Sequence, residues 1–523
     1  MSSFSFHPYL KHLHPVPHGG ASQLVARGFD PKQLDDFSAS LLPIETPISV
    51  HDSIRNTNIR SYPDPSCTRL KQVLAQKHNV TPEHILCGNG SVELIVAIVR
   101  ACMNEKDTAL IIGPTFGEYE GAVRSIGAEP IILCTTNIDT VIQGIAEHQP
   151  KLVFLCNPNN PTGHLWEGAQ IDRIAQAAPL VLDEAYMEFL RPAKPSLWGK
   201  GRFVLRSLTK DHAMAGLRIG YAIAEPDVIK AVSHVVIPWS ASTIAQEAAI
   251  AALQNPAPYQ QAMDRLWDER TRLITSLKKM GYNIVDGSAP FFLIDVGDAS
   301  PFAEKMLSKG IVVRDCTSFG LPNHIRISPQ TKEAGDRLLA AFSDKPIPEK
   351  KHSSGRIHLV FGGARSGKSE YAERLVQSLG GSNVSYMATA QSFDDEMHHR
   401  IDIHQKRRDD EWQTIEEPLH ASKALTKAEH PTVLVDCITL LATNWLLQYN
   451  ADEAMKEIQR LLEASKSRSG DVVMVSNEIG FGVVPMNKLA RSFRDDQGRI
   501  NQRIAEVADS VTLVVAGLPL QLK

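Results

Sequence analysis

The sequence has little net charge and no long apolar run. Its 55 basic and 59 acidic residues leave a formal charge of −4, so bulk electrostatics does not favour a nucleic-acid partner. No apolar run approaches the roughly 20 residues of a membrane-spanning helix, which argues against a membrane span. The first ten residues, MSSFSFHPYL, lack a basic start followed by an apolar stretch, so we expect no signal peptide.

The cysteines form no C-x-x-C pair, and we find neither an internal repeat nor a long low-complexity tract. Seven scattered cysteines argue against a disulfide framework or a cysteine-based zinc site. They favour reduced thiols, and we therefore expect a cytoplasmic location.

The chain does contain material for several large cores, with 523 residues of which 43% are hydrophobic. Short apolar runs alternate with helical patterns from about residue 65, which predicts an α/β architecture. Residues 343–356, SDKPIPEKKHSSGR, are polar and carry two prolines. This composition is typical of a linker. We expect a first domain at 1–343, a linker at 344–355 and a second domain at 356–523.

A lysine at the end of an apolar run is the first candidate catalytic residue. Lys210 lies in the segment RSLTKDHAMAGLR, which follows Phe203–Leu205. A lysine held at a strand end in a polar pocket can form a Schiff base with an aldehyde cofactor. Ser207, Thr209 and Arg218 are residue types that hold a phosphate beside it. An isolated lysine in a loop is usually a surface residue, so the interpretation depends on stretches elsewhere.

Stretches upstream of Lys210 supply the other parts of a pyridoxal phosphate site. Gly90 and Ser91 precede a helical pattern, where free backbone N–H groups favour an anion, although such turns are common. Phe116 could stack on a planar ring or pack in the core. Asn160 lies in the tight loop NPNNPTG after an apolar run. Asp183 closes another apolar run, and a buried carboxylate there needs a cation such as a protonated pyridine nitrogen.

Two arginines provide candidate substrate contacts. Arg314 and Arg326 each follow an apolar strand pattern, and arginine binds carboxylate or phosphate through two parallel hydrogen bonds. Ordinary surface charge is the alternative interpretation. His18, which precedes two glycines, is placed to meet an anionic substrate, and Tyr62 projects from a proline-containing turn.

The motifs CNPNNPTG, LDEAY and SLTK…GLRIGY resemble the pyridoxal-phosphate enzymes of the aspartate aminotransferase fold. Over residues 15–342 the sequence looks most like threonine-phosphate decarboxylase of cobalamin synthesis, with histidinol-phosphate aminotransferase as the near relative. The fold expected from this resemblance is a large mixed-sheet domain plus a small α/β domain. The resemblance implies Lys210 as the Schiff-base lysine and Asp183 at the pyridine nitrogen. It further implies ring contacts at Phe116, Asn160 and Tyr186, phosphate contacts at Gly90, Ser91, Ser207, Thr209 and Arg218, and a phosphate contact across a dimer interface at Tyr62.

The same resemblance assigns Arg326 to the substrate carboxylate, and His18 and Arg314 to the substrate phosphate. The sequence departs from the family at one place. The family usually has asparagines after D-F-S-x, whereas this chain has Ser40, Leu41 and Leu42, so the amide contacts to substrate are missing.

The second domain begins with a phosphate-binding loop. An apolar run ends in GGARSGKS, the full G-x-x-x-x-G-K-S pattern, and a helical pattern follows. Backbone N–H groups of such a loop cradle phosphates, its lysine reaches the terminal phosphates and its serine can hold Mg²⁺. Asp436 ends a later apolar run and suits a metal-side carboxylate. The loop residues are Gly362, Gly363, Ala364, Arg365, Ser366, Gly367, Lys368 and Ser369.

A histidine beside basic residues is a candidate nucleophile in this domain. His404 would lie one helical turn after Arg400 and could attack an α-phosphate, although most such histidines are simply solvated. The motifs GGARSGKS, ATA-x4-DEM and NEIGFGVVP resemble adenosylcobinamide kinase/adenosylcobinamide-phosphate guanylyltransferase over residues 356–523. The resemblance implies that His404, rather than His398 or His399, carries GMP. The expected nucleotide site also includes Ala388, Thr389, Ala390, Gln405, Lys406, Arg407, Arg408, Glu416 and Asp436.

The two resemblances meet in one pathway. We expect a bifunctional enzyme that makes aminopropanol phosphate with pyridoxal phosphate and then activates the corrin-linked phosphate with GTP, or ATP, and Mg²⁺. Its expected partners are small-molecule substrates and a second copy of the chain. Two alternatives stay open, namely an aminotransferase fused to the same guanylyltransferase and a degenerate N-terminal scaffold. The roles of residues 477–485 and 499–503, structural or substrate-facing, also stay open.

Overall fold

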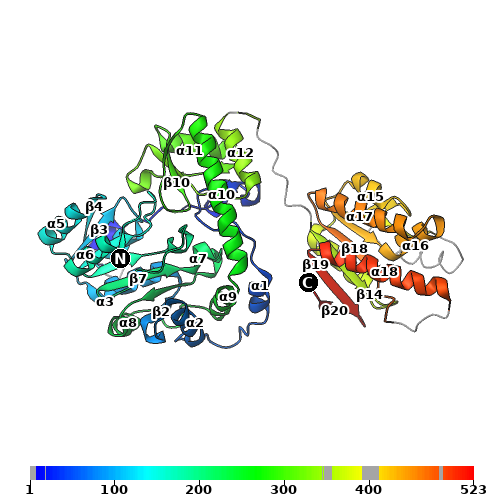
Figure 1. Cartoon of the computed structure of the whole chain (residues 1–523), viewed down its shortest axis with the longest axis horizontal. Helices are drawn as coiled ribbons and strands as arrows, with labels where there is room; N and C mark the ends of the chain where they lie inside the picture. The colour runs from blue at the N-terminus through cyan, green and yellow to red at the C-terminus, as the bar shows by residue number, and fades with distance from the viewer. Residues whose placement is uncertain are drawn as a thin grey trace, which may run out of the picture. The chain divides into compact units, whose positions relative to one another are not determined.

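The computed structural model describes residues 7–13, 15–17, 19–343, 345–346, 356–391, 412–481 and 487–523. The chain divides into two compact units, Met1–Pro348 and Glu349–Lys523, called unit 1 and unit 2 below (Figure 1). The linker expected at 344–355 lies largely outside the described residues, so its boundaries stay a prediction.

Unit 1 is built on a seven-stranded sheet in the order β2-β8-β7-β6-β5-β3-β4. Strand β8 runs antiparallel to both of its neighbours, whereas β7, β6, β5, β3 and β4 run parallel to one another. The strands are β2 (Ile85–Gly88), β3 (Thr108–Gly113), β4 (Glu129–Cys134), β5 (Leu152–Cys156), β6 (Leu180–Asp183), β7 (Arg202–Ser207) and β8 (Gly220–Ile223).

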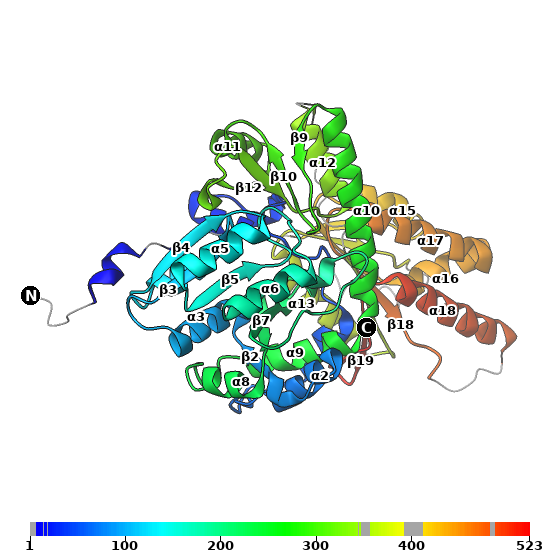
Figure 2. The ribbon, with the colours of Figure 1, turned by 60° about the vertical axis from the view of Figure 1, so that its left-hand side comes forward.

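Both faces of this sheet are covered, which is why its central strands read as continuous apolar runs. Along β3, Leu110 and Ile112 join one core, and Ala109 and Ile111 join the other. Helices α2, α5, α6 and α9 contribute to the first core, and α3, α4 and α8 to the second (Figure 2). The helices are α1 (Ile48–Arg55), α2 (Thr68–His78), α3 (Gly90–Cys102), α4 (Glu118–Arg124), α5 (Ile138–His148), α6 (Gly168–Ala177), α7 (Leu208–Asp211), α8 (Pro226–Ser233) and α9 (Thr243–Gln254).

A smaller part of unit 1 packs around a four-stranded antiparallel sheet in the order β12-β13-β10-β9. The long helix α10 joins the two parts, because Leu266 packs in the core of the large sheet and Leu273 in the core of the small one (Figure 2). Strand β1 (Asp35–Asp36) pairs in parallel with β11 (Ile311–Val312). The remaining elements are α10 (Ala257–Lys279), β9 (Asn283–Val285), β10 (Phe292–Asp295), α11 (Ala299–Ser308), β12 (Arg314–Asp315), β13 (His324–Ile327) and α12 (Lys332–Phe342).

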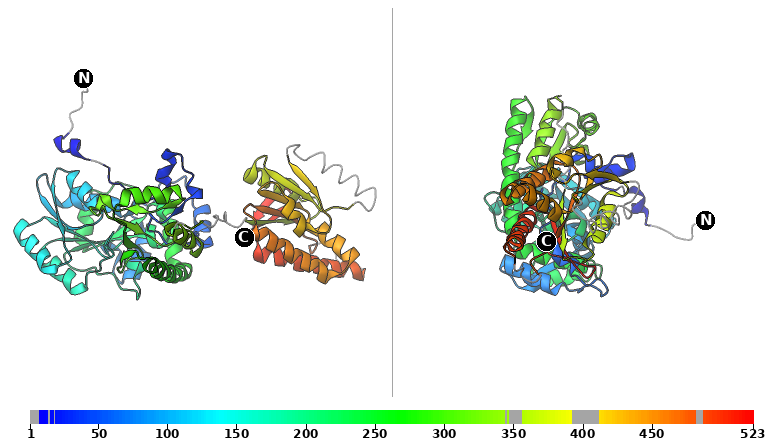
Figure 3. Two further views of the ribbon diagram at one scale, coloured as in Figure 1. Left: turned by 90° about the horizontal axis from the view of Figure 1, so that it is seen from above. Right: turned by 90° about the vertical axis from the view of Figure 1, so that its right-hand side faces the viewer.

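Unit 2 contains a second seven-stranded sheet, in the order β16-β15-β17-β18-β14-β19-β20, in which only the edge strand β20 is antiparallel. Helices α15 to α18 cover one face, as Figure 3 shows for the orange and red helices, and α13 packs on the other. The elements are β14 (Ile357–Gly362), α13 (Lys368–Gly380), β15 (Val384–Ala388), β16 (Gln413–Glu416), α15 (Ala421–Ala424), β17 (Thr432–Asp436), α16 (Ile438–Gln448), α17 (Ala451–Ser467), β18 (Val472–Asn477), α18 (Lys488–Val507), β19 (Ser510–Val515) and β20 (Leu518–Gln521).

Among the described residues, no helix combines the length and the apolar composition that a membrane crossing requires.

Candidate active site

A cavity of about 350 Å³ opens in unit 1 where three parallel strands end. Because parallel neighbours carry their carboxyl ends at one edge of a sheet, Cys156 of β5, Asp183 of β6 and Ser207 of β7 meet there. The cavity also gathers most of the residues that the sequence singled out in this unit. Those that line it are Ser91, Phe116, Asn160, Asp183, Tyr186, Ser207, Thr209, Lys210, Arg218, Arg314 and Arg326.

Lys210 lines the cavity from the short helix α7, directly after β7. Burial, followed by the charges of Arg326 and Arg218, lowers the pKa of Lys210 from 10.5 to about 8, while Asp183 acts in the opposite direction. A pKa near 8 leaves about one lysine in ten neutral at pH 7, and the neutral amine is the form that attacks an aldehyde.

Asp183 is buried at the end of β6, with 3% of its surface exposed. The hydroxyl of Tyr119 donates to its Oδ2 over 2.8 Å, and the backbone N–H of Ala185 donates to its Oδ1 over 2.9 Å. Burial nevertheless raises the pKa of Asp183. A protonated ring nitrogen in the cavity would give this carboxylate the cation that its burial demands.

The phosphate-binding types predicted around Lys210 come together as a cradle. The helix α3 begins at Gly90, whose φ of +74° suits glycine. A Cβ at Gly90 would come within 2.6 Å of the Arg218 guanidinium, so that arginine lies directly against the helix start. Ser207 and Thr209 share a hydrogen bond of 2.6 Å at the same edge. Backbone amides, two hydroxyls and one guanidinium form a donor set suited to a phosphate.

Arg326 reaches the cavity from β13 of the small sheet and is 5% exposed. Its guanidinium donates to Asn160 Oδ1 and to the backbone oxygen of Ser38, the latter over 2.8 Å. The same guanidinium lies 4.8 Å from the ring centroid of Phe291, a cation–π contact that fixes its plane. Arg326 therefore links the large and small sheets across the cavity.

Arg314 lines the cavity from β12, beside Arg326 on the paired strand β13. Its NH2 donates to the backbone oxygen of Pro17 and to the hydroxyl of Ser318, each over 2.8 Å. The guanidinium also lies 5.1 Å from the centroid of Phe319. Burial, followed by the charge of Arg326, lowers the pKa of Arg314.

The charge in this cavity fits pyridoxal phosphate with an anionic substrate. Within the described residues Arg218, Arg314 and Arg326 form no ion pair with a carboxylate. The Nε of Arg326 is buried, and no hydrogen-bond partner for it lies in the described parts of the chain. Arginines held together without counterions favour a ligand with several negative charges.

The wall where the family usually has asparagines is less polar here. The hydroxyl of Ser40 is satisfied by Ser328 over 2.6 Å, Leu41 lines the cavity, and Leu42 is buried in the core. Phe116 lies edge-on to Tyr119, with centroids 5.6 Å apart. The side-chain amides that the resemblance leads one to expect are therefore missing from this wall.

Tyr62 does not line the cavity of its own chain. Its surface is 82% exposed, and its ring lies against Trp239 with centroids 5.0 Å apart. This placement agrees with a contact across a subunit interface, which stays a prediction.

In unit 2 the phosphate loop connects β14 to α13 as the sequence predicted. Gly367 has a φ of +89°, and a Cβ at Gly362 would meet the backbone oxygen of Val514 at 2.4 Å, so both positions need glycine. Lys368 Nζ donates to the backbone oxygen of Gly363 over 3.2 Å. Ser366 Oγ is buried, and the described residues offer it no hydrogen-bond partner. The loop therefore keeps donors for a ligand phosphate.

Asp436 ends β17, and it influences the loop lysine. Burial lowers the pKa of Lys368, while Cys437 and Asp436 act to raise it. Tyr386 donates to Asp436 Oδ2 over 2.7 Å. Because β14 to β18 are parallel, their carboxyl ends lie at one edge of the sheet. That edge carries the loop together with Ala388, Thr389, Glu416 and Asp436.

Several sequence predictions lie outside the described residues, and their roles stay predictions. They are His18, His398, His399, His404, Gln405, Lys406, Arg407 and Arg408.

For Asn501 and Arg503 of α18, the contacts favour a structural role over a substrate contact. Asn501 donates to the backbone oxygen of Asn477 over 3.0 Å and accepts from Ser476 over 2.6 Å. Arg503 donates to Gln459 on α17, away from the phosphate loop.

Sequence analysis missed several residues of the first site. Tyr119 was not selected, although it follows Phe116 by one helical turn and bonds Asp183. Ser38 was also missed, and its backbone oxygen holds Arg326. A tyrosine in an apolar pattern gives little signal, because its partner lies 64 residues away in the sequence.

Two families match the two units. Residues 36–342 match the family described as aminotransferase class I and II. Residues 358–522 match the family described as cobinamide kinase / cobinamide phosphate guanyltransferase.

Curated relatives and solved structures cover unit 1. The chain is 32% identical to histidinol-phosphate aminotransferase of Caldanaerobacter subterraneus subsp. tengcongensis over 316 residues, which is 58% of this chain and 89% of the relative. It is 33% identical to histidinol-phosphate aminotransferase 2 of Archaeoglobus fulgidus, covering 61% of this chain and 96% of the relative. The structure of histidinol-phosphate aminotransferase from Sinorhizobium meliloti in complex with pyridoxal-5′-phosphate superimposes with a TM-score of 0.59 at 25% identity, covering 66% of this chain and 98% of that one.

A donor set that fits pyridoxal phosphate thus lies in a region that matches a known family over more than half of the chain. The protein belongs to the aminotransferase class I and II family, a pyridoxal-phosphate fold, and carries in addition a nucleotide-binding domain of the cobinamide kinase / cobinamide phosphate guanyltransferase family.

Proposed function

We propose that unit 1 decarboxylates L-threonine O-3-phosphate to aminopropanol phosphate. We further propose that unit 2 phosphorylates adenosylcobinamide and transfers GMP from GTP to the phosphate. The observation that carries this proposal is the covalent union of a cavity for an anionic amino acid with a cobinamide kinase / cobinamide phosphate guanyltransferase domain. The amine and the phosphate of the first product are the groups that cobinamide assembly requires.

Each side of the cavity in unit 1 has a proposed task. Pyridoxal phosphate, when bound, supplies an electron sink for a bond broken at the α-carbon of the substrate. Lys210 would hold the cofactor through its aldehyde carbon, and Asp183 would keep the ring nitrogen protonated. Arg326 binds the substrate carboxylate, and Arg314 binds its phosphate together with His18. Ser207, Thr209 and Arg218 bind the cofactor phosphate with the start of α3.

An aminotransferase is the second candidate, because the curated relatives quoted above carry the name histidinol-phosphate aminotransferase. The two reactions differ in which bond at the α-carbon is broken, and both use the same cofactor contacts. Leu41 on the cavity wall and the internally bonded Ser40 support a departure from those relatives.

The decisive experiment assays the purified protein separately with threonine phosphate and with histidinol phosphate. With pyridoxal phosphate and carboxyl-labelled threonine phosphate, we expect labelled CO₂ and aminopropanol phosphate. Histidinol phosphate with 2-oxoglutarate is expected to give no glutamate, and glutamate without CO₂ would establish the aminotransferase. A protein without the visible absorbance of lysine-bound cofactor would support the degenerate scaffold instead. Lys210→Ala is the negative control.

For unit 2, the proposed nucleotide ligands are the phosphate loop, Asp436 and the segments around Thr389 and Glu416. His404 is the proposed carrier of GMP. We expect His404→Ala to abolish labelling by GTP that carries a radioactive α-phosphate, whereas His398→Ala keeps it. Labelling that persists in His404→Ala contradicts the assignment.

We also propose a homodimer through unit 1. The rings of Tyr62 and Trp239 are in tilted contact. Ile59 and Ile237, nearby in the sequence, are 73% and 64% exposed, a concentration of apolar surface typical of an interface. Analytical ultracentrifugation of the wild-type protein and of Tyr62→Asp tests this proposal. We expect a wild-type dimer that the variant weakens, and a wild-type monomer at micromolar concentration would contradict the proposal.

A further inference from the structure

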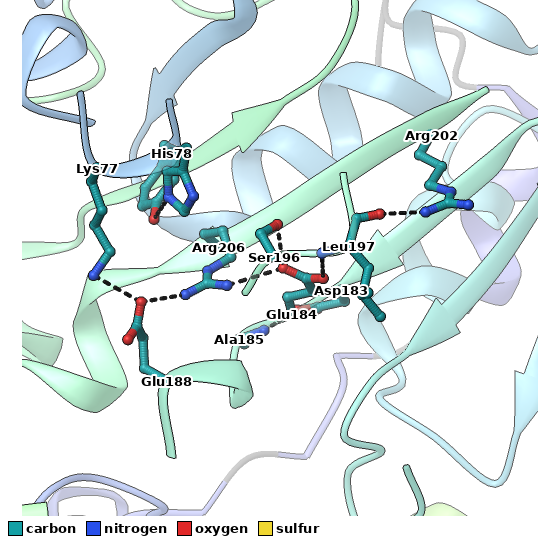
Figure 4. Close-up of polar contacts among 11 residues, drawn as sticks. Lys77, His78, Asp183, Glu184, Ala185, Glu188, Ser196, Leu197, Arg202 and Arg206 are labelled. Carbon is teal, nitrogen blue, oxygen red and sulfur yellow. Dashed lines mark hydrogen bonds and ion pairs between the residues drawn. The ribbon is translucent and has the colours of Figure 1, made fainter. Parts of the chain in front are cut away.

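A buried group of charged residues lies behind the cavity, on the opposite face of the sheet ends. Successive side chains of a strand point to opposite faces. Asp183 and Ser207 line the cavity, so their neighbours Glu184 and Arg206 point away from it. Figure 4 shows these two side chains meeting, with Glu188, Lys77 and Ser196 beside them.

Arg206 holds two carboxylates of one short segment. Its NH1 donates to Glu184 Oε2 over 3.0 Å, and its NH2 donates to Glu188 Oε1 over 2.6 Å. The side chains of Arg206 and Glu184 are 4% and 0% exposed. Lys77 of α2 adds a second cation to Glu188 over 2.8 Å. Buried charges of this kind are tolerated only where they are paired and hydrogen-bonded.

Glu184 is satisfied from a second direction as well. Ser196 donates to its Oε2 over 2.6 Å, and the backbone N–H of Leu197 donates to its Oε1 over 2.7 Å. Burial acts to lower the pKa of Arg206, but Tyr221, Glu188 and Glu184 raise it above its ordinary value. The guanidinium of Arg206 therefore keeps its positive charge between the two carboxylates.

The positions of these residues in the chain connect them to the cofactor contacts. Glu184 directly follows Asp183, and Glu188 follows Tyr186 by two residues. Arg206 directly precedes Ser207, and Lys210 follows Arg206 by four residues. The guanidinium of Arg206 therefore joins two parts of the site. It fixes the segment that carries Asp183 against strand β7, which leads to Ser207 and Lys210. Neither Arg206 nor Glu184 is among the described residues that line the cavity.

We propose that Arg206 and Glu184 are positioning residues that hold the ring-nitrogen carboxylate and the phosphate cradle at the separation that pyridoxal phosphate requires. Contacts held by a rigid supporting layer bind more tightly than the same contacts on loose segments. The proposal depends on pyridoxal phosphate binding in this cavity and is independent of whether the enzyme decarboxylates or transaminates.

The test compares two isosteric substitutions on the same network in the full chain. Glu184→Gln removes the charge next to Asp183, and Glu188→Gln removes the same charge at the more exposed end, where Glu188 is 32% exposed. For each variant freed of cofactor, we measure the dissociation constant of pyridoxal phosphate by fluorescence titration. We also measure the visible absorbance of the lysine-bound cofactor against pH, and the Tm.

We expect Glu184→Gln to weaken pyridoxal phosphate about tenfold or more and to move the pH midpoint of the visible band, because Asp183 and Lys210 change their separation. Glu188→Gln is expected to weaken binding less than about threefold, since Glu184 still holds Arg206. A Tm that falls in both variants with unchanged cofactor affinity and unchanged pH midpoint would overturn the proposal, because a merely structural network gives that result.

Ser196→Ala covers the case in which Glu184→Gln does not fold. It removes one donor to Glu184 and leaves both charges in place, so we expect the fold to survive and the cofactor affinity to fall about threefold. An unchanged affinity in Ser196→Ala counts against the proposal. A wild-type protein that binds no pyridoxal phosphate would refute the cofactor assignment itself, whereas failure of decarboxylation alone leaves this inference standing.

Discussion

Unit 1 and unit 2 each contain a site suited to an anion, but the positive charge of the two sites comes from different groups. The cavity of unit 1 relies on side chains, with Lys210, Arg218, Arg314 and Arg326 around one space. The loop of unit 2 relies on backbone N–H groups and on the start of α13, with Lys368 as its lysine. Backbone donors are neutral, so they can be buried at little cost, whereas gathered cations repel one another and depress each other's pKa.

The difference also explains where supporting structure is needed. The loop of unit 2 keeps its shape through glycine at positions such as Gly362, where a neighbouring backbone oxygen leaves no room for a Cβ. In unit 1 the side chains reach the cavity from separate elements, and two of them show what holds them in place. Arg326 depends on Asn160 and Ser38, and Asp183 depends on Tyr119.

The largest expected effect separates the two units by their chemistry. We expect Lys210→Ala to reduce CO₂ release from threonine phosphate by at least about a thousandfold, because no second lysine is among the described residues that line the cavity. GTP labelling of the same sample is expected to stay unchanged. Both assays on one preparation check this, and a variant that keeps more than a few per cent of the activity contradicts the role of Lys210.

The second prediction measures the cost of burying Lys210 near two arginines. A pKa lowered from 10.5 to about 8 corresponds to at most roughly 3 kcal/mol of lost folding stability. The unfolded lysine stays protonated up to about 10.5 and the folded one to about 8, so stability rises with pH between these values. Below pH 8 the full cost is present.

We therefore expect Lys210→Met to stabilise cofactor-free unit 1 at pH 7 and to remove this rise above pH 8. Urea unfolding of the full chain at pH 7 and pH 10, followed by a unit 1 signal, provides the measurement. Equal pH dependence in wild type and variant would show that neither burial nor the neighbouring arginines lower the pKa of Lys210.

The third prediction concerns the lysine of the loop. We expect Lys368→Met to weaken GTP about a hundredfold, the usual loss when one preorganised donor to a phosphate is removed. Pyridoxal phosphate absorbance in unit 1 should not change. Equilibrium dialysis with labelled GTP checks this, and unaltered binding would mean that the backbone alone holds the nucleotide.

The smallest expected effect compares two glycines of the two sites. Gly90→Ala forces an alanine into a φ of +74° with a Cβ 2.6 Å from the Arg218 guanidinium. We expect about tenfold weaker pyridoxal phosphate binding and a loss of about 1–3 kcal/mol. A Cβ at Gly363 meets nothing within 4 Å, so Gly363→Ala should leave the Tm of the nucleotide-free protein unchanged. Equal losses of stability in the two variants would contradict this comparison.

Residues at strand ends could be predicted from the sequence. Asp183 and Asp436 each close an apolar run, and the buried faces of a parallel sheet require such runs. Motifs with fixed spacing, such as the phosphate loop, were also predictable, because all their parts lie in one segment. Tyr119 and Arg206 were not, because their partners come from other segments and no local spacing signals the contact.

The sequence by itself determined the order of the elements, the α/β class of both units and the identity of the groups predicted to bind phosphates. Tertiary structure decided which of these groups share one cavity, that Lys210 lies between two arginines, and that Arg206 supports the site from behind. The physical reason is the distance along the chain over which each effect acts. Backbone preferences and apolar periodicity act over a few residues, whereas burial, charge pairing and pKa depend on neighbours that only the folded chain brings together.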